Sequence, residues 1–230
     1  MRFTLVHSPL TGPGCWRPVA AALVARGHEA LAVDPGPVGV GDDYQALAGR
    51  IVARAAVAGA TDVLVGHSGA GGLLAGVAAA LNPKATLFVD AILPHPGRSW
   101  FDTAPPALVK RLRSLVQDGR LPPWNRWFSI GAPENNLSDP AQRAAFLAEL
   151  PSPPVSYLEA LAPAWPFPPA ISTAYVQLSG AYAREALAAR DGAWTIVRAE
   201  LHHLAMLTEP DTIADLLLEA VARVEAEAGT

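Results

Sequence analysis

The chain has 230 residues, of which 51% are hydrophobic and 17% charged, and its formal net charge is −4. This length suits one domain with an insertion, and the acidic balance argues against nucleic acid as the main partner. The single cysteine, Cys15, excludes an intramolecular disulfide, and no run of 18 apolar residues predicts a membrane span. The first apolar run is too short for a signal peptide, so we expect a cytoplasmic protein.

Strand and helix patterns alternate along most of the chain. Short apolar runs bounded by turn residues predict strands over residues 2–7, 29–34, 62–66, 84–90, 173–180 and 194–200. Helical periodicity predicts helices over residues 17–27, 42–59, about 70–81, 183–191 and about 211–225. Such alternation predicts right-handed crossovers and a mostly parallel sheet of about six strands with helices on both faces.

The alternation breaks once, over residues 94–168. This range holds no convincing strand, two predicted helices, many prolines and four of the six tryptophans, Trp100, Trp124, Trp127 and Trp165. We therefore predict an α/β core formed by residues 1–93 and 169–230, with residues 94–168 inserted as a helical cap.

One serine lies in an unusual turn. The third predicted strand runs into Gly66-His67-Ser68-Gly69-Ala70, and a helix follows. A strand that enters a helix through Gly-x-Ser-x-small is typical of a nucleophile elbow, in which the turn would force Ser68 into a strained backbone conformation and the Gly69 N–H would stabilise an oxyanion. The alternative is a glycine-rich phosphate-binding turn. The glycines do not form G-x-G-x-x-G and no Walker lysine follows, so we favour the nucleophile.

Several motifs now fall in an order seen in one superfamily. They are LVHSPLTGPGCWRPVAAAL, VGHSGAGG, FVDAILPHPG and HHLAMLTEP, and together they span nearly the whole chain. The chain resembles an α/β-hydrolase of the short form found in hydroxynitrile lyases, plant methylesterases and menaquinone-pathway hydrolase-like enzymes. The resemblance implies the α/β-hydrolase fold but says little about the substrate, because one fold hosts many chemistries.

The predicted base is His203. A hydrolase triad needs a histidine after the last strand, and only His202 and His203 lie between the last predicted strand and the last helix. The family often has a GHLAML-like segment here, so the resemblance makes His203 the base and puts His202 in the place of the glycine. His203 would take the Ser68 proton and return it to the leaving group.

The predicted acid is Asp90. No aspartate ends the strand over 173–180, where most α/β-hydrolases carry the acid, whereas Asp90 ends the strand over 84–90. A carboxylate after a buried strand needs a partner. We predict that Asp90 accepts the N–H of His203. The alternative is that Asp90 caps the first turn of the cap.

The predicted oxyanion site departs from the family pattern. Family members often carry His-Gly-x after the first strand and use the N–H of the third residue. Here the sequence is His7-Ser8-Pro9-Leu10, and Pro9 has no N–H. Either the Leu10 N–H moves in, or the Ser8 hydroxyl contributes, or the site is weak, which would favour lyase or cyclase chemistry. We expect Leu10 to act with Gly69.

These assignments predict a serine hydrolase for a carboxylic ester, lactone or thioester of a small apolar substrate, working through an acyl-enzyme. The alternatives are a lyase or cyclase with the same triad, or a silent binding protein on this scaffold. Aromatic residues suit an apolar pocket, so Trp100, Trp124, Trp127 and His67 are tentative substrate contacts. We expect no cofactor, no metal, and no nucleic-acid or membrane partner. The oligomeric state stays open, with a homodimer among the options.

Overall fold

A single six-stranded sheet forms the centre of the computed structural model, which describes residues 1–128, 133–168 and 170–229. All strand pairs are parallel, in the order β2-β1-β3-β4-β5-β6. The strands are β1 (Arg2–Val6), β2 (Glu29–Val33), β3 (Val63–His67), β4 (Ala85–Val89), β5 (Ser172–Gln177) and β6 (Thr195–Arg198). The sequence-based strands agree with these to within a few residues at each end, and the predicted parallel sheet is confirmed.

The central strands are apolar because both faces of the sheet are covered. Every residue of β3 and β4 is buried. Successive side chains alternate between two clusters, with Val63 and Val65 in one and Leu64 in the other. A strand buried on both sides therefore reads as a continuous apolar run, without polar alternation.

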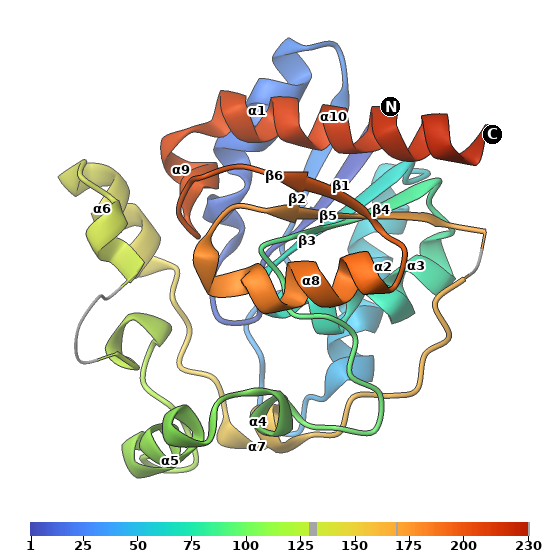
Figure 1. Ribbon diagram of the computed structural model, residues 1–230. Coiled ribbons are helices and arrows are strands. Elements are labelled where there is room, and N and C mark those ends of the chain that lie inside the picture. The colour runs from blue at the N-terminus through green and yellow to red at the C-terminus, as the bar shows by residue number, and fades with distance from the viewer. Residues whose placement is uncertain (129–132, 169, 230) are drawn as a thin grey trace.

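Helices cover the two faces as separate layers (Figure 1). One layer holds α1 (Arg17–Ala25) and α10 (Pro210–Ala228), which pack together, and the other holds α2 (Tyr44–Ala58), α3 (Leu74–Leu81) and α8 (Ala183–Asp191). Several of these helices begin at residues that favour a helix N-terminus. A proline lies in the first turn of α1 and of α10, and the Asp43 carboxylate caps α2 by accepting the Ala46 N–H at 2.9 Å.

The chain between β4 and β5 forms short helices that lie to one side of the sheet (Figure 1). They are α4 (Trp100–Thr103), α5 (Pro106–Leu115), α6 (Pro140–Ala148) and α7 (Val155–Glu159), with the 3₁₀ turns η3 (Trp124–Arg126) and η4 (Pro133–Asn136). In the described part of residues 94–168, no segment joins the sheet. Residues 129–132 of the predicted cap, and 169 and 230 of the predicted core, lie outside the described residues. The boundaries of the cap stay a prediction.

Because all strands are parallel, their carboxyl ends meet at one edge of the sheet, where α/β proteins place their ligands. Four short elements start there or next to it: η1 (Pro13–Cys15), η2 (Ser68–Gly72), η5 (Gly180–Tyr182) and α9 (Ala205–Thr208). Among the helices of the described ranges, none combines the length and the hydrophobicity needed to cross a membrane.

Candidate active site

Ser68 lies at the sharp turn between β3 and η2, with a φ of 56° in the left-handed region that costs a non-glycine residue energy. The turn is possible because its neighbours are small. A Cβ on Gly66 would lie 2.7 Å from the Leu74 side chain, and one on Gly71 would lie 1.8 Å from the Ile92 carbonyl oxygen. The local sequence therefore produces the geometry of a nucleophile elbow.

Asp90 directly follows β4, is fully buried and has a φ of 42°. Its Oδ1 accepts the backbone N–H groups of Leu178 at 2.8 Å and Ser179 at 3.0 Å. Its Oδ2 accepts the Ser179 hydroxyl at 2.6 Å and the Nδ1–H of His203 at 3.0 Å. Four donors compensate the loss of water around this carboxylate. With its proton on Nδ1, neutral His203 carries its lone pair on Nε2.

The Nε2 atom of His203 is buried and has no hydrogen-bond partner among the described residues. The Ser68 hydroxyl lies 3.3 Å from the hydroxyl of Tyr182, and no hydrogen bond joins it to His203 within the described ranges. The Tyr182 ring stacks on the imidazole with centroids 4.8 Å apart and an interplanar angle of 7°. The structure thus brings a serine, a histidine with a free lone pair and a phenol to one point.

The neighbouring histidines take structural positions. His202 accepts the Leu204 N–H on Nδ1 at 3.2 Å and donates from Nε2 to the Thr208 hydroxyl at 3.0 Å, so it does not reach Asp90. His67 is fully buried and donates from Nε2 to the His203 carbonyl oxygen at 2.9 Å. Burial, and then the repulsion that a second positive charge would meet from the nearby His203 ring, hold the pKa of His67 well below its ordinary 6.5.

The loop after β1 lies against the elbow. The Leu10 N–H donates to the Ser8 hydroxyl oxygen at 3.2 Å, and Ser8 is only 1% exposed. A Cβ on Gly69 would lie 2.8 Å from the same oxygen. The Ser8 hydroxyl thus lies beside both predicted oxyanion donors, and its own proton is free to point away from Leu10.

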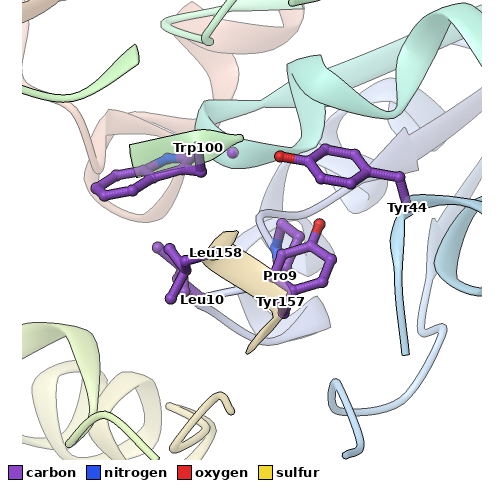
Figure 2. Close-up of a pocket in the computed structure, with 7 residues that line it drawn as sticks. Pro9, Leu10, Tyr44, Trp100, Tyr157 and Leu158 are labelled. Atoms are coloured by element: carbon purple, nitrogen blue, oxygen red, sulfur yellow. The ribbon is translucent and has the colours of Figure 1, made fainter. Parts of the chain in front are cut away.

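A small cavity of about 10 Å³ lies beside Gly69, and Figure 2 shows the side chains around it. Residues between β4 and β5 contribute Trp100, Tyr157 and Leu158, and the chain before β4 contributes Pro9, Leu10, Gly69 and Tyr44. The Tyr44 hydroxyl donates to Nε2 of His95 at 2.9 Å, since Nδ1 of His95 donates to the Leu93 carbonyl oxygen at 3.0 Å. A cavity of this size holds about one water molecule.

Of the tentative substrate contacts, Trp100 lines this cavity and the Trp124 ring lies 5.8 Å from that of His203. Trp127 and His67 do not reach the cavity. Trp127 is 1% exposed, packs on Trp100 and donates its indole N–H to the Pro122 carbonyl oxygen at 2.8 Å. His67 lies beneath His203. Both side chains are packed inside the protein in this structure, and their role as substrate contacts stays a prediction.

Sequence reasoning missed Tyr182. Tyr182 follows β5, where most α/β-hydrolases carry the acid. A tyrosine at that position is not part of the expected triad, so nothing in the sequence assigned it a role. Tyr44 and Tyr157 were not predicted either. They lie on α2 and α7, outside the sequence motifs that pointed to the site. Among the described residues, no group of three His, Cys, Asp or Glu side chains is placed to hold a metal ion.

Comparison with known proteins supports the fold. The chain matches the model of the alpha/beta hydrolase family over residues 5–216 and therefore belongs to that family. It is similar to an extracellular alpha/beta-hydrolase of a Paenibacillus species, with a TM-score of 0.77, 20% identity and coverage of 96% of this chain and 98% of that one. A methylesterase of Arabidopsis aligns with a TM-score of 0.71 and 16% identity over 96% of this chain and 99% of its own. The α/β-hydrolase fold predicted from the sequence is confirmed.

Two curated relatives align over part of the chain. Esterase PIR7B of Oryza sativa subsp. japonica is 38% identical over 109 residues, which are 42% of this chain and 40% of that protein. A carbendazim hydrolyzing esterase of a Nocardioides species is 35% identical over 119 residues, 46% of this chain and 48% of that protein. The aligned segments span less than half the length of either relative.

Proposed function

We propose that this α/β-hydrolase is a serine esterase for a small apolar ester, lactone or thioester, with Ser68 as nucleophile, His203 as base and Asp90 as acid. The observation that carries the proposal is the 3.0 Å hydrogen bond between Asp90 and His203, formed beside a strained serine at an elbow. The names of the two curated relatives, both esterases, support the same chemistry.

The reaction follows from the positions of these groups. The Ser68 oxygen attacks the carbonyl carbon while Nε2 of His203 takes its proton, and Asp90 stabilises the imidazolium through Nδ1–H. The bond from carbon to the leaving group then breaks, and the leaving atom receives the proton from Nε2. An acyl-enzyme remains on Ser68, and a water molecule activated by His203 releases the acid in the same way.

The resting geometry suits this reaction after a small rearrangement. The Ser68 hydroxyl contacts Tyr182 at 3.3 Å, and Nε2 of His203 has no partner among the described residues. Rotation about the Cα–Cβ bond of Ser68 would turn the hydroxyl from Tyr182 to Nε2. Catalytic hydrogen bonds often tighten in this way only when substrate binds.

The oxyanion would be held by the Gly69 N–H together with a donor from the loop after β1. Leu10 remains the predicted residue, either directly or through the Ser8 hydroxyl to which its N–H donates. Pro9 cannot serve, because it has no N–H. The positive end of the turn that follows Ser68 adds to this stabilisation.

The test is covalent labelling with a fluorophosphonate, followed by peptide mass spectrometry and the structure of the adduct. We expect the label on Ser68, with the phosphonyl oxygen within about 3.5 Å of the Gly69 nitrogen and of Leu10 N or Ser8 Oγ. Ser68→Ala should fold normally and lose roughly 10⁴- to 10⁶-fold in the hydrolysis of a panel of esters. Ser114→Ala, an exposed change on α5, should leave the rate unchanged.

The outcomes separate the candidate functions. Labelling at Ser68 with turnover of at least one ester would support the esterase. Labelling at Ser68 without turnover of any ester would favour the lyase or cyclase alternative. A Ser68→Ala variant that kept most of its rate would show that another group is the nucleophile.

A further inference from the structure

Tyr182 contacts the two groups that the proposed reaction uses. Its hydroxyl lies 3.3 Å from Ser68 Oγ, and its ring lies parallel to the His203 imidazole at a centroid distance of 4.8 Å. A tyrosine on the surface, away from the site, would make neither the contact with Ser68 nor the stacking on His203. The phenol is therefore part of the site, although the steps above do not use it.

The position of Tyr182 is fixed by the same carboxylate that orients His203. Three of the four hydrogen bonds of Asp90 go to Leu178 and Ser179, which connect β5 to η5. Tyr182 is the last residue of η5. Asp90 thus holds the imidazole on one oxygen and, through this short connection, the phenol that covers the imidazole.

The order of the strands decides which side of Ser68 the phenol occupies. Ser68 follows β3, and the loop with Ser8 and Leu10 follows β1, which pairs with β3 on one side. Asp90, Tyr182 and His203 follow β4, β5 and β6, which lie on the other side. The loop that carries the predicted oxyanion donor Leu10 therefore lies on the side of the serine opposite to Tyr182.

The side occupied by His203 is where the leaving group must be, because Nε2 delivers the proton to it. The phenol stacked on His203 lies on this side too. Burial raises the pKa of Tyr182, so its O–H stays protonated and remains a donor throughout the neutral range.

We propose that Tyr182 is a catalytic residue whose O–H donates a hydrogen bond to the leaving-group oxygen while Nε2–H of His203 protonates it. This inference rests on the proposed esterase function. As the carbon–oxygen bond breaks, its electron pair moves to the leaving oxygen, and that oxygen takes the proton that His203 received from Ser68. Tyr182 keeps its own proton. The contribution is largest for alcohols that leave as poorly stabilised alkoxides.

The experiment compares the wild-type protein with Tyr182→Phe, which keeps the ring stacked on His203 and removes the hydroxyl. Both are assayed on esters of one acid with ethanol, trifluoroethanol, phenol and p-nitrophenol, and kcat/KM is plotted against the pKa of the alcohol. We expect a loss of about 10- to 100-fold for the ethyl ester, the effect of a hydrogen bond to a charged group, and about threefold or less for the p-nitrophenyl ester. The slope of the plot should become steeper.

A matched control is Tyr175→Phe. The Tyr175 hydroxyl donates to the Ala91 carbonyl oxygen at 2.8 Å and accepts the Ala91 N–H at 3.0 Å, so its loss should lower the melting temperature and affect all four esters equally. An equal loss for all esters in Tyr182→Phe would overturn the leaving-group role. Absence of fluorophosphonate labelling in the wild-type protein would instead overturn the esterase proposal itself.

Discussion

Two residues with left-handed backbone angles end neighbouring strands, Ser68 after β3 and Asp90 after β4. Such a conformation costs a non-glycine residue about 1–3 kcal/mol and persists only where the surroundings determine it. At Asp90 the four hydrogen bonds to its carboxylate supply that constraint. Asn82, Asp118 and Ala193 also have positive φ, but of these five residues only Ser68 and Asp90 directly follow strands at the carboxyl edge of the sheet.

Asp90→Asn is expected to fold and to lose about 10³- to 10⁴-fold in kcat/KM. The remaining Oδ1 can still accept the N–H groups of Leu178 and Ser179. The new amide nitrogen, however, would face Nδ1–H of His203, so the imidazole would move its proton to Nε2. The base would then lack the lone pair that takes the Ser68 proton. Steady-state kinetics and thermal unfolding measure the two effects.

Asp62→Asn is the matched control, because Asp62 accepts the Arg2 N–H at 2.8 Å just before β3, at the opposite edge of the sheet. It should lower stability slightly and leave kcat/KM unchanged. If Asp90→Asn kept the wild-type rate, Asp90 would have only a structural role.

At the scale of elements, the cap contributes to the cavity through α4 and α7. Trp100 comes from α4, and Tyr157 and Leu158 come from α7. The cavity measures about 10 Å³, so if the acyl group of a substrate binds here, these side chains would limit its size. Figure 2 shows how they lie around the cavity. We therefore expect α4 and α7 to set the size of the group bound there.

Leu158→Ala is expected to widen the preference of the enzyme toward longer acyl chains. Leu158 is 1% exposed, so its truncation should also lower the free energy of unfolding by about 2–4 kcal/mol. The measurement is kcat/KM for p-nitrophenyl esters from acetate to octanoate, normalised to acetate.

Leu112→Ala provides the comparison, since Leu112 on α5 is fully buried in the same hydrophobic cluster but does not line the cavity. It should cost similar stability without altering the chain-length profile. Equal profiles for the Leu158 and Leu112 variants would show that the acyl group binds elsewhere.

At the scale of the whole molecule, the fold buries several imidazoles in neutral form. His7, His67 and His95 are buried, and burial lowers the pKa of each below its ordinary 6.5. A base whose pKa is lower in the folded state takes up protons more readily when unfolded. Stability is therefore fully present above pH 6.5 and is lost as the pH falls below that value.

We expect the free energy of unfolding in urea to be level near neutral pH and to decline below about pH 6.5. Each histidine that stays neutral when folded contributes about 1.4 kcal/mol per pH unit to this decline. His67→Gln, whose amide can still donate to the His203 carbonyl oxygen, should make the decline shallower. An unchanged slope in this variant would mean that His67 is protonated in the folded protein.

The sequence by itself determined the six strands, the main helices of the core, the fold class and the elbow, but not α4 or α7. These depend on local physics: apolar runs long enough for buried strands, helical periodicity between them, and small residues around Ser68 where the turn has no room for a side chain. Strand–helix alternation then left few topologies, because parallel crossovers are right-handed. Elimination among strand ends also led to Asp90 and to the pair His202 and His203, of which the family resemblance selected His203. These roles stay predictions.

Only the tertiary structure decided which side chains meet at the serine. Tyr182 lies 114 residues from Ser68 in the chain, and no local pattern in its own segment shows that its ring covers His203. Trp127 and His67 look like ligand contacts by composition, yet packing turns both into the interior. Residue type and spacing fix the element that a side chain belongs to. The order of the strands and the packing of the cap fix where it points.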